Sequence, residues 1–586
     1  MRRLFLATWF YTLAFGLLVF LFFAIIYPFH LHYQEQFQLF LFSDSYLFRY
    51  LSKPGGVADY LGNFFTQFFF YAWGGALILA ILLTLLQRLV WVISSSLGAD
   101  KRFFALTFIP SLLYMGLLCN ESYLLGGLMA MLLMAAFIYF YNVIDTIPRR
   151  MVYFFVALPF LYWVAGGLFI LLFLFAVLKE LRNGQIQSLW LLVFILGGVI
   201  LSVALPVICQ YSFLQYPLPK AFVGVNYYRY PINLPYMVAV TGLLLVLIPF
   251  GMAYMSKALP KISPLGIMSP IVVVIAGAGI FIQSMSDFQK ENIMDYDFYA
   301  RMRKWDAIIG KAENQNPQTP LSVTCLNLAL AKKNQLGERM FEFYQKGTGG
   351  LIPDFQKDYT IPMVAGEVYY HLGFINTARR YAFEAMEALP DYQKSSRALK
   401  RLTETAIIKG DYDLVEKYLR ILQKTVFYRV WALRIGENMD DELFIERHPE
   451  WGPLRNLSLK EDFLFSEKEK DMMLGILFTD NRRHRMAFEY LLAHTLLEGN
   501  LRDFMRYFPL MKSIGYRKIP KHFQEALLFV WDLSEKKRMN DIPFAIDRDI
   551  QESYKDFRRM QRNSAGKSEI KDHFSDTYWY YYHYRN

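Results

Sequence analysis

The density of charged side chains changes abruptly near residue 285 of this chain. From Leu4 to Ser284 there are seven acidic and thirteen basic residues, whereas the 302 residues after Ser284 contain 44 acidic and 47 basic residues. A charged group in the middle of a bilayer is costly, so membrane helices are apolar and their charges gather in the connecting loops. The apolar runs before residue 285 are long enough to cross about 30 Å of hydrocarbon. The sequence therefore predicts an all-α protein in which a polytopic transmembrane helical domain precedes a water-soluble helical domain.

Net charge and cysteine content exclude several classes of protein. The formal charge of +11 divides into +8 for residues 1–284 and +3 for the rest. A charge of +3 over a domain of this size gives no basic surface for nucleic acid, and the excess in the first part is typical of cytoplasmic loops. Cys119, Cys209 and Cys325 lie far apart and lack metal-ligand spacing. Neither a disulfide framework, a structural zinc site nor a cofactor is indicated.

The amino terminus predicts a retained membrane helix that enters from the cytoplasm. The apolar run from Leu4 to Phe29 has no small-residue cleavage pattern, and it exceeds the about 7–15 apolar residues of a secretory signal. Other apolar runs are bounded by charges, proline or aromatic pairs. They predict spans at about 64–87, 103–119, 122–143, 188–208, 235–255 and 263–285.

The run from Met151 to Leu178 predicts either one long helix or a hairpin of two short helices, because Pro159 and Gly166-Gly167 interrupt it. Lys and Arg residues near span ends concentrate on the cytoplasmic side of a membrane. With the hairpin, eleven of these residues fall on the cytoplasmic side and four outside, whereas a single helix gives nine and six. The hairpin is preferred. It implies about nine membrane segments, a cytoplasmic N-terminus and an extracytoplasmic (periplasmic) C-terminal half.

Four regions follow from these boundaries. We expect a transmembrane domain at 1–285 with a charged first external loop at 30–63, and a connector at 286–319. A helical-repeat domain is expected at 320–545, followed by a polar and aromatic tail at 546–586. The aromatic run from Tyr578 to Tyr582 is expected to pack back on the repeats, with membrane contact or a partner as the alternatives.

An internal repeat marks the soluble half. Gly337, Gly373 and Gly410 are 36 and 37 residues apart, and a related helix pair turns at Gly499. Such a period is typical of stacked helix-turn-helix units with glycine just after the first helix. The segment 366–373, followed by Ala378, Ala382, Ala385 and Pro390, resembles the tetratricopeptide repeat (TPR) family. Over roughly 320–530 the resemblance implies an α-solenoid whose concave face binds a partner and implies no reaction; an irregular helical bundle is the alternative.

The first external loop is the densest group of ionisable residues before residue 285. Between Pro54-Gly55-Gly56 and the first span it contains Glu35, Asp44, Arg49 and Lys53, and Arg229 is expected on the same side. A carboxylate can act as a general base or metal ligand while Arg and Lys hold a phosphate, so these residues suit a polyprenyl-phosphate lipid. The structural alternative is that the cations only snorkel to the membrane surface.

The layout of the first half also resembles the GT-C superfamily of membrane glycosyltransferases, with a cytoplasmic N-terminus, a large acidic first external loop and a soluble outer domain. The resemblance implies a polyprenyl-phosphate-linked sugar donor, catalysis by Asp44 or Glu35, phosphate binding by Arg49, Lys53 and Arg229, and a divalent metal. The usual adjacent pair of acids is missing, because Ser43-Asp44-Ser45 offers one.

Over its whole length the chain resembles an uncharacterised family of bacterial multi-pass membrane proteins with TPR-like C-terminal regions. The similar segments are Pro54-Gly55-Gly56 with Tyr60, Gln524–Leu528 and Thr577–Tyr582. The resemblance implies the bacterial inner membrane and no activity. Our main hypothesis is therefore an envelope protein, embedded in the lipid bilayer, whose repeat domain binds a protein or envelope-glycan partner. A GT-C-like glycosyltransferase and a transporter are the alternatives.

Overall fold

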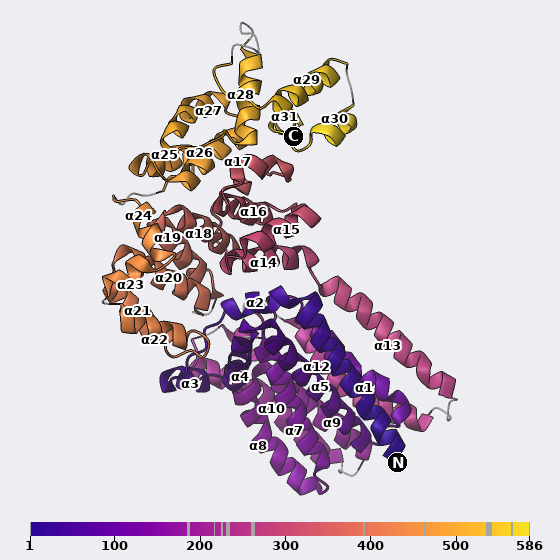
Figure 1. Ribbon diagram of the computed structural model, residues 1–586. Helices are drawn as coiled ribbons and strands as arrows, with labels where there is room; N and C mark the ends of the chain where they lie inside the picture. The colour runs from indigo at the N-terminus through magenta and orange to yellow at the C-terminus, as the bar shows by residue number, and fades with distance from the viewer. Residues whose placement is uncertain are drawn as a thin grey trace. The chain divides into compact units, whose positions relative to one another are not determined.

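The structure, a computed structural model, describes residues 2–184, 188–215, 217–223, 227–229, 235–258, 264–390, 393–439, 441–461, 465–534, 542–563 and 566–584. Within these ranges all regular structure is helical, apart from one isolated antiparallel bridge between Tyr123 and Tyr228. The chain divides into two compact units (Figure 1). The first unit contains Met1–Glu291 and Lys424–Arg429; the second contains Asn292–Gln423 and Val430–Asn586.

The first unit contains both long apolar helices and short helices. In chain order they are α1 (Arg2–Leu21), α2 (Pro28–Gln36), α3 (Asp44–Leu51), α4 (Gly56–Thr66), α5 (Ala72–Ser96), α6 (Ile109–Leu117), α7 (Leu125–Val143), α8 (Ile147–Ala165), α9 (Ile170–Asn183), α10 (Ser188–Ser212), α11 (Leu218–Val223), α12 (Tyr236–Ala258), α13 (Pro264–Met285) and the start of α14 (Phe288–Arg301). A π turn at Phe22–Ile26 and 3-10 turns at Gln67–Phe70, Lys101–Phe108 and Gly166–Phe169 connect some of them.

Six helical stretches among the described residues are long and apolar enough to cross a membrane. They are Thr8–Ile26, Ala72–Ser96, Leu125–Val143, Ile147–Asn183, Leu189–Ser212 and Tyr236–Ala258. Large apolar side chains such as Phe10, Leu18 and Val156 are exposed along them. Exposed apolar surface of this extent is costly in water and expected against hydrocarbon, so the first unit is suited to association with a membrane.

Two of the predicted spans differ from the observed helices. The span predicted at 64–87 corresponds to α5 at Ala72–Ser96, because residues up to Phe70 complete α4 and a 3-10 turn, and the extended backbone of Tyr71 separates that turn from α5. The span predicted at 103–119 is divided into a 3-10 segment and α6, with Pro110 in the first turn of α6. Hydropathy located both apolar runs but missed these local breaks.

The chain reverses direction within Ile147–Asn183, as the charge count predicted. Arg150, near the start of α8, donates two hydrogen bonds to the carboxylate of Glu180, near the end of α9, at 2.8 and 3.0 Å. Both side chains are buried, and Tyr141 also donates to Glu180 at 2.8 Å. The reversal occurs at Gly166, whose φ of 69° is accessible to glycine at little cost. The ends of α8 and α9 therefore lie side by side in a hairpin.

The helix α5 lies at the centre of the first unit, where it packs against α1, α6, α7 and α12. A short chain of polar side chains crosses this apolar contact: Thr12 donates to Gln87 at 2.9 Å, and Gln87 donates to Thr107 at 2.8 Å. All three residues are fully buried. In hydrocarbon such interhelical hydrogen bonds satisfy groups that would otherwise lack a partner.

The segment Lys424–Arg429 packs within the first unit although its sequence neighbours belong to the second. Phe427 stacks on Phe70 with ring centroids 4.9 Å apart. The backbone amide of Phe42 donates to the carbonyl of Lys424 at 2.8 Å, and the Tyr428 hydroxyl donates to Glu35 at 3.3 Å. Nothing in the local sequence distinguishes these six residues from their neighbours.

The second unit consists of shorter helices that pack in sequence order, most clearly from α18 to α21 (Figure 1). Beyond α14 its helices are α15 (Trp305–Asn314), α16 (Pro320–Lys332), α17 (Leu336–Arg339), α18 (Thr360–Leu372), α19 (Ile375–Glu387), α20 (Ser396–Lys409), α21 (Tyr412–Leu422), α22 (Arg429–Asn438), α23 (Glu442–Arg447), α24 (Trp451–Leu457), α25 (Lys470–Asp480), α26 (Arg485–Glu498), α27 (Leu501–Tyr507), α28 (Lys521–Leu533), α29 (Arg548–Arg562), α30 (Lys567–Phe574) and α31 (Tyr578–Tyr584). Short 3-10 turns occur at Met340–Glu342, Gly347–Gly350 and Phe508–Ser513.

Three of the four predicted turn glycines end a helix in the left-handed conformation. Gly373, Gly410 and Gly499 have φ values of 92°, 77° and 77° and follow α18, α20 and α26. The prediction for Gly337 was wrong, because this residue is buried inside α17 and a Cβ there would lie 2.9 Å from Pro520. The turn before α17 is made by Asn334 instead, with a φ of 58°.

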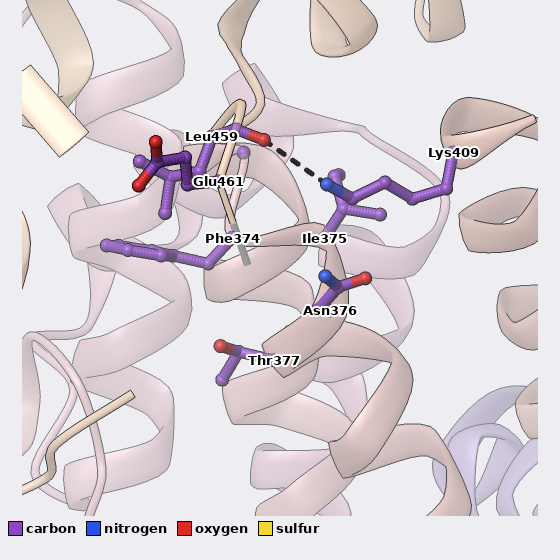
Figure 2. Close-up of a pocket in the computed structure, with 8 residues that line it drawn as sticks. Phe374, Ile375, Asn376, Thr377, Lys409, Leu459 and Glu461 are labelled. Carbon is purple, nitrogen blue, oxygen red and sulfur yellow. Dashed lines mark hydrogen bonds between the residues drawn. The ribbon is translucent and has the colours of Figure 1, made fainter. Parts of the chain in front are cut away.

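The turn at Gly373 is covered by the segment after α24. A Cβ on Gly373 would lie 2.9 Å from the carbonyl oxygen of Leu457, and Lys409 donates to the carbonyl of Leu459 at 3.2 Å (Figure 2). The space left beside Phe374 and Glu461 is about 10 Å³. That is room for about one water molecule, so this small pocket is a packing feature.

The aromatic C-terminal residues pack back on the second unit, as expected. Tyr578 and Trp579 are buried, and the amide of Tyr578 donates to Glu525 of α28 at 2.8 Å. The ring of Trp579 lies 5.0 Å from that of Tyr554 on α29. Residues 546–586 include three helices, α29 to α31.

A buried network of charged side chains joins α14, α18 and α20. Arg397 donates to both oxygens of Asp297 at 2.6 and 2.9 Å and to Glu367 at 3.1 Å. Arg401 donates to the other oxygen of Glu367 at 2.6 Å and pairs with Glu404 at 2.9 Å. Burial alone would raise the pKa of Glu367, but the two guanidinium groups outweigh it and hold this pKa well below its ordinary value.

We expect Glu367→Gln to lower the free energy of unfolding by about 3–5 kcal/mol at pH 7, because the change leaves two buried guanidinium groups short of a charge. The lowered pKa means that the contribution of Glu367 is present above its ordinary pKa of about 4.3 and is lost only as the pH falls through the lowered value. Urea unfolding of the purified full chain at pH 7 measures the change. The control is Glu416→Gln, which removes an exposed pair with Arg420 that is worth about 0.3–0.5 kcal/mol. Equal losses of unfolding free energy in Glu367→Gln and Glu416→Gln would show that the buried network does not stabilise the fold more than an exposed ion pair.

Candidate functional site

The two acids predicted from the first external loop have opposite environments. Asp44 is exposed in the first turn of α3, where the side chain of the preceding Ser43 accepts the amide hydrogen of Tyr46 at 3.3 Å. Glu35 is buried on α2, and its carboxylate accepts the hydroxyl hydrogen of Tyr428. Of the two alternative acids, only Asp44 is therefore exposed.

The predicted phosphate-binding cations are likewise dispersed. Arg49 is exposed in the last turn of α3. Lys53 forms an ion pair with the buried Asp59 at 3.4 Å, and the guanidinium group of Arg229 lies 3.7 Å from the ring centroid of Phe37. Within the described ranges, no group of three or more His, Cys, Asp or Glu residues is arranged to hold a metal ion. Whether Asp44 or Glu35 has a catalytic role stays a prediction.

A cavity in the second unit offers a more concentrated group of polar side chains. Its volume is about 390 Å³, within the range of about 300–1,000 Å³ that is usual for ligand sites. Ends of helices and turns from five parts of the chain line it, and we call it the polar cavity. Its charged and imidazole side chains are Arg303, Lys332, His371, Glu450, Arg483, His484 and Arg485.

Positive charge dominates the rim of the polar cavity. Four of its lining side chains are cations and one is a carboxyl group. Arg485 is fixed in place, because it donates to Glu489 at 2.7 Å and to the carbonyl of Asn334 at 3.2 Å. Lys332 and Arg483 are exposed. The rim therefore attracts anions and can present exposed cationic groups to them.

Two residues of the cavity wall have an uncommon backbone conformation. Arg303 and Asn334 have φ values of 56° and 58°, and among the non-glycine residues whose backbone is described only these two have positive φ. Asparagine adopts this conformation readily, whereas arginine rarely does. Residues held in sparsely populated conformations cluster at functional sites. Both turns place polar groups at the cavity, Arg303 between α14 and α15 and Asn334 after α16.

The two histidines of the cavity differ in their hydrogen bonding. His484 is fixed as one tautomer: Nε2 donates to the carbonyl of Leu372 at 2.7 Å, and Nδ1 accepts the amide hydrogen of Ala487 at 3.3 Å. His371 is 4 % exposed, and neither of its ring nitrogens has a hydrogen-bond partner. Burial lowers the pKa of His371 well below its ordinary value, and the charge of Lys332 lowers it further. A neutral imidazole with an unused donor and acceptor therefore lines the cavity beside the ring of Trp305, 5.3 Å away.

Glu450 is the acid of the polar cavity. Its side chain is 10 % exposed and forms an ion pair with Arg303. Burial raises the pKa of Glu450 to about 7, and the nearby Glu404 contributes to the increase. Because this carboxyl group changes its charge near neutral pH, the net charge of the cavity rises by one as the pH falls through about 7.

The buried charged network lies next to this cavity. The guanidinium group of Arg401 is 3.6 Å from the ring centroid of Tyr370, and Glu367 lies 4.0 Å from Nε2 of His371. A separation of 4.0 Å is too long for a hydrogen bond. The network therefore fixes α18, which carries His371, but makes no hydrogen bond to either ring nitrogen of His371.

The polar cavity offers groups that can bind an anion. The described lining contains no Ser, Thr or Cys, so a hydroxyl or thiol nucleophile beside a base is not part of it. Cationic side chains, a neutral imidazole and an indole ring can instead hold an anionic group through charge and hydrogen bonds. We infer a binding site for an anion.

The sequence alone does not reveal this site, because its residues are distributed from 303 to 486. The basic run Arg482-Arg483-His484-Arg485 is a local signal, but the net charge of +3 over the residues after Ser284 does not single it out. The cavity forms because helices separated by more than 100 residues end at the same place, which a single sequence does not show.

We expect the affinity of the polar cavity for an anion to increase roughly three- to tenfold between pH 8 and pH 6, because Glu450 becomes neutral and ceases to repel the ligand. The other groups around Glu450 are Arg303, Lys332, Glu367, Arg401, Glu404 and His448. A fluorescent oligoglutamate is a suitable probe, since its carboxylates stay ionised over this range. Glu450→Gln should bind equally well at both pH values, whereas the exposed neighbour Glu446→Gln should retain the wild-type dependence. A pH dependence that persists in Glu450→Gln would show that another group is responsible.

Comparison with known proteins gives a family but no activity. No curated protein and no solved structure matches the chain. A family of unknown function (DUF6057) matches residues 2–585, which includes both units and every residue of the polar cavity. The chain therefore belongs to this family of unknown function.

Proposed function

We propose that this protein is a binding protein of the bacterial inner membrane whose TPR-like second unit binds an anionic group of a protein or envelope polymer in the polar cavity. The observation that carries the proposal is the cavity itself, in which four cations and the unpartnered, buried His371 face one space of about 390 Å³. Leaving two buried imidazole nitrogens without partners is costly in a structure that serves stability alone. A ligand that supplies those partners accounts for the cost.

The membrane setting supports this function by fixing the binding unit at a surface. Six apolar helical stretches are long enough to serve as the anchor, and the charge count favours a second unit outside the cytoplasm. Partners in the periplasm include acidic polymers and the acidic segments of other membrane proteins. A weak site is effective there, because partners confined to the same envelope are present at high local concentration.

The affinity of the purified full chain for labelled anions tests the proposal. We expect oligoglutamate or oligoglucuronate to bind with an affinity that falls as salt is raised, and neutral oligoglutamine and glucan to bind weakly or not at all. Preference for oligoglutamate indicates a protein partner, and preference for oligoglucuronate indicates a glycan. Failure of both acidic probes to bind would refute an anion site.

Two variants connect this binding to the cavity. Arg483→Gln should weaken binding roughly tenfold, the loss expected for one charge-assisted hydrogen bond, whereas the adjacent exposed Arg482, which does not line the cavity, should tolerate the same change. His371→Phe should weaken binding without lowering the unfolding midpoint, since the phenyl ring leaves no buried nitrogen unpartnered. A His371→Phe variant that binds normally but unfolds earlier would indicate a purely structural histidine.

The proposed topology has its own test. A reporter that is active only in the cytoplasm, fused after Asn586, should give no signal, because the loop charges favour an external second unit. The same reporter fused after Arg149, in the first turn of α8 at the end expected on the cytoplasmic side, should be active. A strong signal after Asn586 would reverse the orientation.

A further inference from the structure

A second cavity lies in the first unit and differs from the polar cavity in composition. Its volume is about 610 Å³, and three segments line it. One wall is α1, which belongs to a stretch long enough to cross a membrane. The others are the segment from Asp100 to Met115 and the helix α13, which packs on α6 and on the 3-10 segment before it.

The interior of this cavity, which we call the apolar cavity, is hydrophobic. Phe15 on α1 packs edge-to-face against Phe108, with ring centroids 5.3 Å apart, and Leu18 and Leu112 line the cavity as well. Small residues on α13 leave space, and a Cβ added at Gly279 would contact nothing within 4 Å. An apolar space of this size beside a membrane helix excludes water and accepts hydrocarbon chains.

Charged residues are confined to one end of the apolar cavity, at Asp100, Lys101 and Arg102. This end is fixed to the last turn of α12: the amide of Asp100 donates to the hydroxyl of Ser256 at 2.7 Å, and Arg102 donates to the Ser256 carbonyl at 3.1 Å. Asp100 offsets part of the charge of Arg102, with 3.5 Å between them. Lys101 is exposed, and Lys257 follows Ser256 in the chain. The end therefore carries net positive charge.

We propose that the apolar cavity binds an anionic membrane phospholipid, with an acyl chain between α1 and α13 and the phosphate at Lys101 and Arg102. Charge complementarity selects the anionic headgroup, because basic groups between membrane helices favour such lipids by about 1 kcal/mol per Lys or Arg. The proposal depends on the membrane setting and not on the polar cavity, so the two sites can be tested separately. A bound lipid would fill the space between α1 and α13 and fix these helices on the segment between them.

Native mass spectrometry of the purified full chain tests the cavity itself. The protein is titrated with phosphatidylglycerol or with phosphatidylcholine of the same acyl composition. We expect phosphatidylglycerol to bind preferentially and Gly279→Leu to lose most of the bound lipid, since Gly279 lines the cavity and its added Cβ would have open space around it. The control is Gly277→Leu on the same helix, which also has open space around it but does not line the cavity. Equal lipid binding by the two variants would overturn the proposed position.

The charge of Lys101 tests the headgroup assignment. Lys101→Gln should reduce the preference for phosphatidylglycerol over phosphatidylcholine about fivefold, whereas the exposed Arg149→Gln, elsewhere on the unit, should leave it unchanged. Binding of both lipids with equal affinity by the unmodified chain would refute selection of an anionic lipid. Loss of preference in both variants would show that the general surface charge is responsible rather than the cavity.

Discussion

The carboxylate of Glu367 accepts hydrogen bonds from two buried guanidinium groups, and this contact determines how α14, α18 and α20 pack. Removing these ions from water costs several kcal/mol for each, which is offset only when every charge has well-placed partners. Asp297 and Glu404 supply the remaining partners. The network then holds three carboxylates and two guanidinium groups, and Lys400 pairs with Glu404 at 3.7 Å, so the charges balance. Burial, together with the negative charge of Glu404, makes ionisation of Glu450 costly and raises its pKa to about 7. The pH response of the polar cavity therefore depends on the packing of α14, α18 and α20, because this packing keeps Glu404 close to Glu450.

The fold could be predicted where one sequence pattern has one structural cause. It could not be predicted where the same pattern has two possible causes. The length of the apolar runs predicted long apolar helices, and loop charge predicted the hairpin that Arg150 and Glu180 close. Glycine spacing predicted left-handed helix ends at Gly373 and Gly410. The same spacing failed at Gly337, because a glycine required for close packing against Phe523 cannot be distinguished in sequence from one required for a turn. The segment 424–429 was missed because aromatic residues such as Phe427 have no periodic pattern that identifies their partner.

The candidate site was less predictable than the fold. The sequence directs attention to the first external loop, since charges are conspicuous between apolar spans, yet the structure disperses those residues: Asp44 is exposed and Glu35 is buried. The polar cavity combines residues whose types are common in any soluble helical domain. Its distinguishing features are a positive φ at Arg303 and the lack of partners at His371, and both depend on tertiary packing. No count of residue types reveals either one.

The charges around the polar cavity also restrict how a ligand can lie in it. Arg303, Lys332 and Arg483 are exposed at the rim, whereas the cations of the network next to α18 are already paired with carboxylates. An anionic group that moved toward that network would leave the exposed cations and would lose its hydration without gaining an unpaired cation. In the proposed function the anionic group therefore stays with the exposed cations, and an uncharged part of the partner extends toward Trp305 and His371. The neutral imidazole is suited to that position, because it can donate one hydrogen bond and accept another without adding charge. The choice of partner would then depend on its uncharged part, and the strength of binding would depend on the exposed cations of the rim.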